Sequence, residues 1–157
     1  MKKTNAARQL DRLGIHYEVR EYEVDLEDLS APTVAAKVGL MPAQVFKTLL
    51  VEGSDGSHLM AVVAADAELD LKAVARATGH RKVSMVALAN VQRLTGYVRG
   101  GVTALAAKKR FPVIADVTLT DHPIVAVSAG ARGQQLVLRP EDYAGAVEAQ
   151  LAPIRRS

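Results

Sequence analysis

The chain has 157 residues, of which 49% are hydrophobic and none is cysteine, and its formal net charge at pH 7 is +3. The lack of cysteine excludes disulfides, thiolate metal sites and a cysteine nucleophile, while the length and hydrophobic content suit one globular domain over residues 1–157. The basic N-terminus continues into polar residues and no apolar run is long enough to cross a membrane, so we expect a soluble, cytoplasmic protein with no membrane partner.

The first half of the chain predicts two helices and three strands. In order, these are a helix at 5–13, a strand at 16–22, a helix at 30–38 and strands at 45–51 and 58–64. Thr4 suits the N-cap of the first helix, and Ser30 with Pro32 suits the start of the second. The segment 54–57 (Ser-Asp-Gly-Ser) is typical of a turn, so we expect the last two strands to form a hairpin.

The second half predicts three more helices and four more strands. In order, these are a helix at 71–78, a strand at 82–85, a helix at 86–94, strands at 112–115, 123–127 and 135–138, and a closing helix from 140 or 141 to about 151. Asp70 and Gly79 suit the cap and the end of the first of these helices. Helices and strands do not strictly alternate, which indicates an α/β (α+β) fold: a mixed β-sheet or barrel of six to seven strands with flanking helices.

The strand at 45–51 places one lysine in an apolar row. Side chains alternate across a strand, so Lys47 shares a face with Val45 and Leu49, and Thr48 lies on the other face. One interpretation is structural: Lys47 protects an edge strand or extends its ammonium to water. The other is functional, because a lysine at the rim of an apolar pocket can bind a phosphate, a carboxylate or a developing oxyanion.

The common catalytic and cofactor motifs are absent from the sequence. The four histidines are far apart and predict no metal site, and Ser128 lacks the Gly-x-Ser-x-Gly setting of a hydrolase nucleophile. The glycine-rich stretch 95–103 has neither dinucleotide-binding nor P-loop spacing. Any catalysis must therefore use Lys, Thr, Ser, Tyr and backbone amides, which hold charge and orient a substrate but are poor nucleophiles.

Three short basic clusters make RNA a candidate partner. They are Arg81-Lys82, Lys108-Lys109-Arg110 and Arg155-Arg156. Each alone is equally typical of a solvated surface, and the net charge is small for a dedicated nucleic-acid-binding domain. Together they make RNA a hypothesis for the partner.

A set of short motifs runs in one order through the chain. The motifs are Asp28-Leu29-Ser30-Ala31, Val34-Ala35-Ala36-Lys37-Val38-Gly39, Val45-Phe46-Lys47-Thr48-Leu49, Leu69-Asp70-Leu71-Lys72, Thr95-Gly96-Tyr97, Gly100-Gly101, Lys108-Lys109-Arg110 and Val127-Ser128-Ala129-Gly130. From about Thr4 to Ile154, this order resembles the YbaK/EbsC family of free-standing aminoacyl-tRNA editing proteins, which are related to the editing domain inserted in bacterial prolyl-tRNA synthetase.

The resemblance implies an aminoacyl-tRNA deacylase that removes wrongly attached amino acids, typically cysteine from tRNA(Pro), and that needs no cofactor and no metal. It implies misacylated tRNA and prolyl-tRNA synthetase as partners, and no DNA. Catalytic roles are implied for Lys47, Tyr22 and Thr48. Substrate-binding roles are implied for Ser30, Gly100, Gly101, Ser128 and Gly130. In the mechanism implied for the family, the thiol of a cysteinyl substrate attacks its own ester, so no catalytic cysteine is required.

The chain departs from the family pattern at four positions. Ala104 and Ala106 stand where many members have a proline and a glycine in the glycine loop, and Gln135 stands where some members have an aspartate. A phenylalanine that some members carry near Ser30 is also missing. Two alternatives therefore stay open beside a cysteinyl-tRNA(Pro) deacylase. One is a deacylase of another mischarged tRNA, such as Ala-tRNA(Pro), and the other is a non-catalytic module that binds tRNA or a synthetase. The aliphatic composition leaves one more, a protein with a plain small-molecule pocket.

Overall fold

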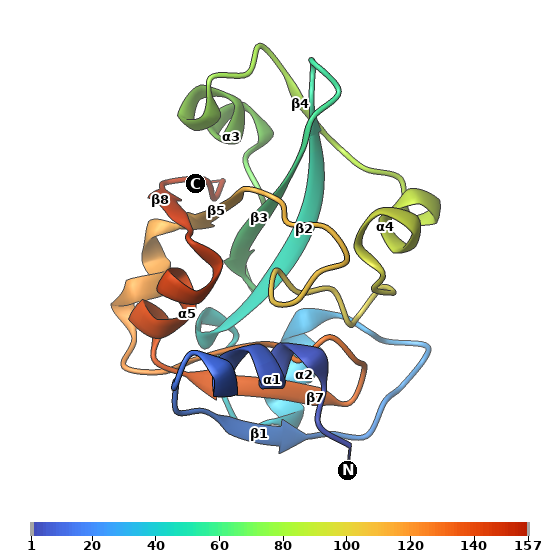
Figure 1. The fold of residues 1–157 in the computed structure, drawn as a ribbon, viewed down its shortest axis with the longest axis vertical. Coiled ribbons are helices and arrows are strands. Elements are labelled where there is room, and N and C mark those ends of the chain that lie inside the picture. The colour runs from blue at the N-terminus through green and yellow to red at the C-terminus, as the bar shows by residue number, and fades with distance from the viewer. Residues whose placement is uncertain (1, 157) are drawn as a thin grey trace.

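The computed structural model describes residues 2–156, which form an eight-stranded mixed sheet surrounded by helices (Figure 1). The α-helices are α1 (Asn5–Arg12), α2 (Ala31–Lys37), α3 (Leu71–Thr78), α4 (Leu88–Thr95) and α5 (Pro140–Val147). The strands are β1 (Glu18–Glu21), β2 (Val45–Gly53), β3 (His58–Ala64), β4 (Val83–Met85), β5 (Val113–Asp116), β6 (Val125–Ser128), β7 (Gln134–Leu138) and β8 (Gln150–Ala152). Two short 3-10 helices are η1 (Pro42–Gln44) and η2 (Val117–Asp121).

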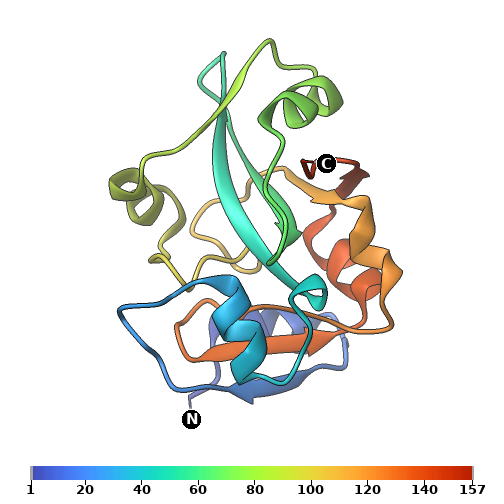
Figure 2. The same cartoon turned by 180° about the vertical axis from the view of Figure 1, so that it is seen from behind.

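Strand β2 is the centre of the sheet. The strand order is β1-β7-β6-β2-β3-β5-β8, and β4 pairs with β2 outside that path. β2 and β3 form a long antiparallel hairpin, whereas β6 runs parallel to the start of β2. Figure 2 shows this hairpin extending away from the base of the molecule, with α3 on one side of it and α4 on the other. The base contains α1, α2, β1 and β7 (Figure 1).

Two of the expected elements match the structure to the residue. Strand β3 covers 58–64 and helix α3 covers 71–78, as predicted. The cap of α3 is also confirmed, because the Asp70 side chain accepts a hydrogen bond from the Ala73 amide at 3.1 Å. Gly79 ends the helix with a φ of +76°, a left-handed conformation that glycine adopts without strain.

The C-terminal part of the chain differs from the expectation. Helix α5 ends at Val147 and does not reach 151, because Glu148 adopts a left-handed φ of +53°. Residues 150–152 instead form β8, which pairs in parallel with β5 and places Gln150 opposite Ile114. This eighth strand was not predicted, since three residues carry too little alternation to indicate a strand by themselves.

The hydrophobic core lies on both faces of β2. The larger cluster includes Leu10, Phe46, Met60, Leu119 and Tyr143. The smaller cluster consists of Ala35, Val45, Ala65, Ala126 and Val137. Helix α2 therefore packs against β2, and this contact brings the residues just before α2 close to the sheet. Within residues 2–156, no helix has both the length and the apolar content needed to span a membrane.

Candidate functional site

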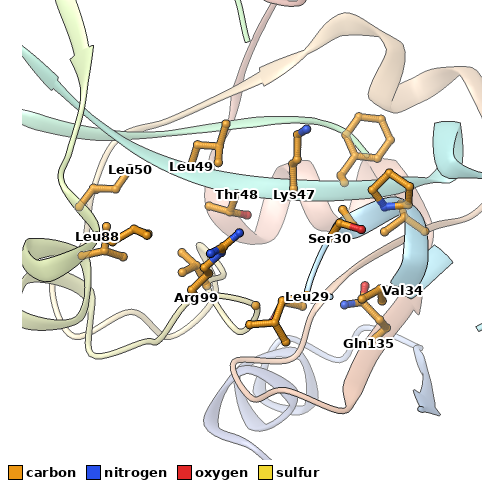
Figure 3. A pocket seen from close by; sticks show the side chains of 18 of the residues that line it. Leu29, Ser30, Val34, Lys47, Thr48, Leu49, Leu50, Leu88, Arg99 and Gln135 are labelled. Carbon is orange, nitrogen blue, oxygen red and sulfur yellow. The ribbon is translucent and has the colours of Figure 1, made fainter. Parts of the chain in front are cut away.

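A pocket of about 370 Å³ lies between β2, the segment that leads into α2, and the segment from β4 through α4 to the glycine-rich loop (Figure 3). This volume falls in the range typical of small-molecule sites. Most of the lining is aliphatic, as expected from a core built of Val, Leu and Ala. The polar residues that line it are Ser30, Lys47, Thr48, Arg99, Ser128 and Gln135.

Lys47 lies at the pocket, but not on an edge strand. Strand β2 pairs with β3, β4 and β6, so the interpretation of Lys47 as the guard of an exposed edge is wrong. The Lys47 ammonium is half-buried and donates a long hydrogen bond of 3.5 Å to the Ala65 carbonyl. Burial lowers the pKa of Lys47, while the carboxylates of Glu68 and Asp66 act in the opposite direction. The pocket therefore has a partly desolvated cation beside it.

Thr48 extends from β2 on the side opposite to Lys47, as the alternation predicts (Figure 3). It is buried and connects the pocket with the core, where its hydroxyl lies near that of Tyr143. Tyr143 is completely buried, and this burial raises its pKa well above the ordinary value, an effect that Thr48 partly offsets. No hydrogen bond of normal geometry reaches the Tyr143 hydroxyl among the described residues.

Ser30 lies at the pocket rim in a hydrogen-bonded turn. Its hydroxyl donates to Thr33 Oγ1 at 3.0 Å, and the Thr33 hydroxyl donates to Asp28 Oδ2 at 2.6 Å. The Ser30 amide donates to the other Asp28 oxygen at 3.0 Å. The hydrogen bonds from Thr33 and Ser30 lower the pKa of Asp28 to about 2. This network keeps the residues before α2 in place, and it occupies the Ser30 hydroxyl proton.

The glycine loops meet behind the pocket. Gly100 lines the pocket and has a φ of +86°, whereas Gly101 packs on Ala131, whose backbone a Cβ on Gly101 would approach to 3.4 Å. Gly130 lies against Tyr97, and a Cβ there would come within 2.9 Å of the Tyr97 ring. Ser128, which lines the pocket two residues before Gly130, accepts a hydrogen bond from the Gly130 amide at 3.1 Å. These glycines allow two loops to pack closely.

The structure thus brings together five of the eight residues proposed from the sequence. Lys47, Thr48, Ser30, Gly100 and Ser128 line the pocket. Gly101 and Gly130 lie one layer behind it, in the loop contact just described. Tyr22 does not line the pocket: it follows β1, is half-buried, and its amide donates to the Gly133 carbonyl at 3.0 Å.

Residues 104–106, where the glycine loop differs from the family pattern, are held in place by hydrogen bonds. Ala106 has a φ of +51°, in the left-handed region that glycine adopts without strain. The Ala106 amide donates to Gln9 Oε1 at 2.7 Å. The Tyr97 hydroxyl lies 2.6 Å from the Leu105 carbonyl and 2.9 Å from that of Ala106. The loop is therefore tied to α1 and to its own start without the proline.

Two polar residues of the pocket had no assigned role in the sequence analysis. Arg99 points its guanidinium toward the space between Thr48 and Ser30 (Figure 3), and it forms no ion pair within residues 2–156. The signal that could have identified it is a basic residue directly before Gly100. Gln135 was noted only as a substitution, although a glutamine beside the apolar run 136–138 is itself unusual.

The chemistry available in the pocket is binding, orientation and charge stabilisation. Lys47 and Arg99 supply positive charge, and most of the surrounding side chains are aliphatic. Within residues 2–156, no group of three or more His, Cys, Asp and Glu side chains is arranged to hold a metal ion. Such a site can stabilise an anion that forms on a bound ester, but the attacking atom would have to come from the substrate or from water.

Comparison with known sequences points to one family. Residues 29–146 match the family model described as an aminoacyl-tRNA editing domain. The chain is 36% identical over 153 residues to a protein of Enterococcus faecalis named as a candidate Cys-tRNA(Pro)/Cys-tRNA(Cys) deacylase, EbsC, covering 98% of this chain and 93% of that protein. A protein of Escherichia coli K12 named multifunctional Ser/Thr-tRNA deacylase ProXp-y is 29% identical over 101 residues, which cover 64% of this chain and 60% of that protein.

Solved structures share the fold over nearly the whole chain. A crystal structure described as a candidate trans-editing enzyme for prolyl tRNA synthetase has a TM-score of 0.84 at 24% identity, covering 99% of this chain and 100% of that one. A second crystal structure, of a hypothetical protein, has a TM-score of 0.88 at 21% identity, covering 97% of this chain and 99% of that one. At these identities the likeness concerns the mixed α/β architecture.

Proposed function

We propose that this chain, which belongs to the family of aminoacyl-tRNA editing domains, acts in trans on misacylated tRNA and removes cysteine from tRNA(Pro). The family model matches more than half of the chain, and the named relatives are deacylases, so the enzyme is an aminoacyl-tRNA deacylase.

The observation that carries the proposal is the pocket itself. It is small and largely apolar, which suits an aminoacyl group with a short side chain, and two cations border it. Lys47 is partly desolvated, and Arg99 has no carboxylate partner among the described residues. Both charges favour an anion in the pocket, either a tRNA phosphate or the oxyanion that forms on the ester. The likeness to EbsC supports cysteine as the amino acid.

In the proposed mechanism the substrate supplies the nucleophile. The cysteinyl sulfur attacks the carbonyl carbon of its own ester, so a carbon–sulfur bond forms and the bond from that carbon to the ribose oxygen breaks. The thiol proton is transferred to the ribose oxygen, which leaves as a hydroxyl, and water later opens the cyclic thioester. Lys47 and Arg99 stabilise the carbonyl oxygen while it carries negative charge, and the apolar walls hold the thiol close to the carbonyl.

Prolyl-tRNA synthetase is the proposed source of the substrate. The net charge of +3 is small for a protein that captures tRNA alone, so delivery by a synthetase would supply the affinity that the basic clusters lack. A second candidate substrate class, seryl- or threonyl-tRNA, is favoured by the likeness to ProXp-y.

The test is single-turnover deacylation of tRNA(Pro) charged separately with cysteine, serine, alanine and proline. We expect the cysteinyl ester to be cleaved fastest, and Lys47→Ala to slow this cleavage about 100-fold, the effect of removing one group that stabilises an oxyanion. Lys72→Ala is the matched control, because Lys72 is an exposed lysine of α3 that does not line the pocket. If the wild type cleaves none of the four esters faster than buffer does, the deacylase proposal for tRNA(Pro) fails.

A further inference from the structure

We infer that Gln135 selects the aminoacyl side chain by hydrogen bonding, so that the pocket prefers short side chains that end in a hydroxyl or a thiol over apolar ones of the same size. The inference rests on the proposed function, because it takes the pocket to be the aminoacyl site. It goes further in naming one residue as the origin of the preference and in defining the substrate class by the chemistry of the side-chain terminus.

The first observation is that Gln135 is buried without a hydrogen-bond partner. Its side chain lines the pocket, yet the residue is only 5% exposed and its Oε1 has no partner. Buried polar atoms in proteins are nearly always paired, so an unpaired amide in a pocket wall indicates a partner that the ligand supplies. Figure 3 shows Gln135 at the same end of the pocket as Val34, Leu29 and Ser30.

The second observation is that the other hydroxyls of the pocket already have neighbours. Ser30 donates its proton to Thr33, Ser128 accepts from the Gly130 amide, and Thr48 lies beside Tyr143. Within residues 2–156, the Gln135 side chain forms no hydrogen bond at all. Among the buried polar side chains of the pocket wall, Gln135 is therefore the one whose side-chain oxygen lacks a partner.

The third observation is that the backbone of Gln135 cannot move away. It lies in β7 between two neighbours, opposite Arg20 of β1 and opposite Ser128 of β6. A turn of the amide about its own terminal bond exchanges the oxygen and the nitrogen. A ligand hydroxyl or thiol can pair with either end, because it can both donate and accept, whereas a methyl group can pair with neither.

The expected discrimination follows from the cost of leaving the amide unpaired. A site built around a hydrogen-bonding group rejects a ligand that lacks the partner, because a buried polar group is then left unsatisfied. For one neutral hydrogen bond the expected preference is about tenfold for serine over alanine. For cysteine over 2-aminobutyrate, which has nearly the same shape, the preference should be smaller, since a thiol is a weak donor.

The experiment measures binding, not turnover, so it does not depend on the catalytic mechanism. The probes are adenosines that carry the amino acid through a stable amide at the 3′ position: seryl, alanyl, cysteinyl and 2-aminobutyryl. Their Kd values are measured by calorimetry for the wild type, for Gln135→Met and for Gln134→Met. Gln134 is the matched control, because it is also a buried glutamine of β7 but does not line the pocket.

We expect the wild type and Gln134→Met to bind the seryl probe about tenfold more tightly than the alanyl probe, and Gln135→Met to bind the two equally. Equal binding by the wild type, or an unchanged preference in Gln135→Met, would overturn the inference and leave the proposed function standing. If no probe binds to the wild type, both fail. Should Gln135→Met not fold, Gln135→Asn keeps the amide but withdraws it by one carbon, and an undiminished preference in that variant would equally overturn the inference.

Discussion

Asp116 and Gln135 are both polar, both nearly inaccessible to solvent and both in strands of one sheet, yet their surroundings are opposite. Asp116, at the end of β5, is 1% exposed and accepts hydrogen bonds from the amides of Ile154 at 2.9 Å, Arg155 at 3.2 Å and Thr118 at 3.2 Å, and one from the Thr118 hydroxyl. Gln135, in β7, is 5% exposed and its carbonyl oxygen has no partner. A buried group that stabilises the fold is paired within the chain, and a buried group reserved for a ligand is not.

The two ends of the sheet, one at Asp116 and one at the pocket, serve different purposes. The Asp116 end joins β5 to the C-terminal segment, where no ligand needs to enter. At the pocket end, within residues 2–156, Gln135 Oε1 has no hydrogen-bond partner and Arg99 forms no ion pair. Among the same residues, Lys47 donates a single long hydrogen bond. Variants at the two ends should therefore affect different properties, stability in the first case and substrate handling in the second.

The largest effect is expected from Asp116→Ala. The change leaves three buried or partly buried amides without their acceptor, so we expect the free energy of unfolding to fall by about 3 kcal/mol or more. Urea denaturation followed by circular dichroism measures it. Asp121→Ala, which removes an exposed aspartate of η2, is the control and should change stability by less than about 0.5 kcal/mol. Similar losses in both variants would contradict the structural role of Asp116.

The second-largest effect is expected from Arg99→Ala, and it concerns substrate binding and not stability. We expect Arg99→Ala to raise the KM for charged tRNA about tenfold and to leave the stability within about 0.5 kcal/mol of the wild type, because the guanidinium is exposed. If Arg99 contacts a phosphate of the single-stranded tRNA end, the slope of log affinity against log salt should also fall by about 0.7. Arg93→Ala, at an exposed arginine of α4 outside the pocket lining, serves as control. If both KM and kcat were unchanged, Arg99 would have no contact with the substrate in either the ground state or the transition state.

A smaller effect on stability is expected for Gln135→Met. Because the amide makes no hydrogen bond in the fold, its replacement by an apolar group of similar size should change the free energy of unfolding by less than about 1 kcal/mol. The same urea experiment measures it. A loss as large as that of Asp116→Ala would mean that Gln135 is a structural group like Asp116, and the contrast between the two ends would disappear.

The smallest effect is the pH dependence contributed by Lys47. Burial lowers the pKa of Lys47 in the folded chain below its usual value of 10.5, so between these two values the unfolded chain binds more protons than the folded one. Stability should therefore rise with pH in this window for the wild type relative to Lys47→Met. Urea denaturation at several pH values from neutral to alkaline gives the difference. A difference that stays constant with pH would contradict the desolvation of Lys47.

Local signals predicted those elements whose boundaries are set by neighbouring residues. Asp70 and Gly79 mark both ends of α3, and the turn at 54–57 marks the end of β2 and the start of β3. Strand β8 carried no such signal, since it is a strand only because β5 lies beside it. The end of α5 was missed for a related reason: Glu148 adopts a left-handed φ of +53°, a conformation that a glutamate in the sequence does not signal.

The candidate site likewise has some features that the sequence alone predicts and others that it does not. The sequence by itself determined that Lys47 and Thr48 lie on opposite sides of one strand, because alternation is a property of any extended chain. It determined that no cysteine or clustered histidine motif supplies the chemistry, and its motifs identified the family. These properties depend on residue type and on short-range order.

Only the tertiary structure decided which residues meet. Pairing of β2 on both sides places Lys47 inside the sheet and not at its edge, and close packing of two glycine loops brings Arg99 and Ser128 to one pocket while Tyr22 stays outside it. Whether a polar side chain is satisfied also depends on neighbours distant in sequence, since Asp116 finds the amides of Ile154 and Arg155 and Gln135 finds none. Burial and hydrogen bonding across strands are properties of the assembled sheet, so no local pattern in the sequence could have distinguished these two residues.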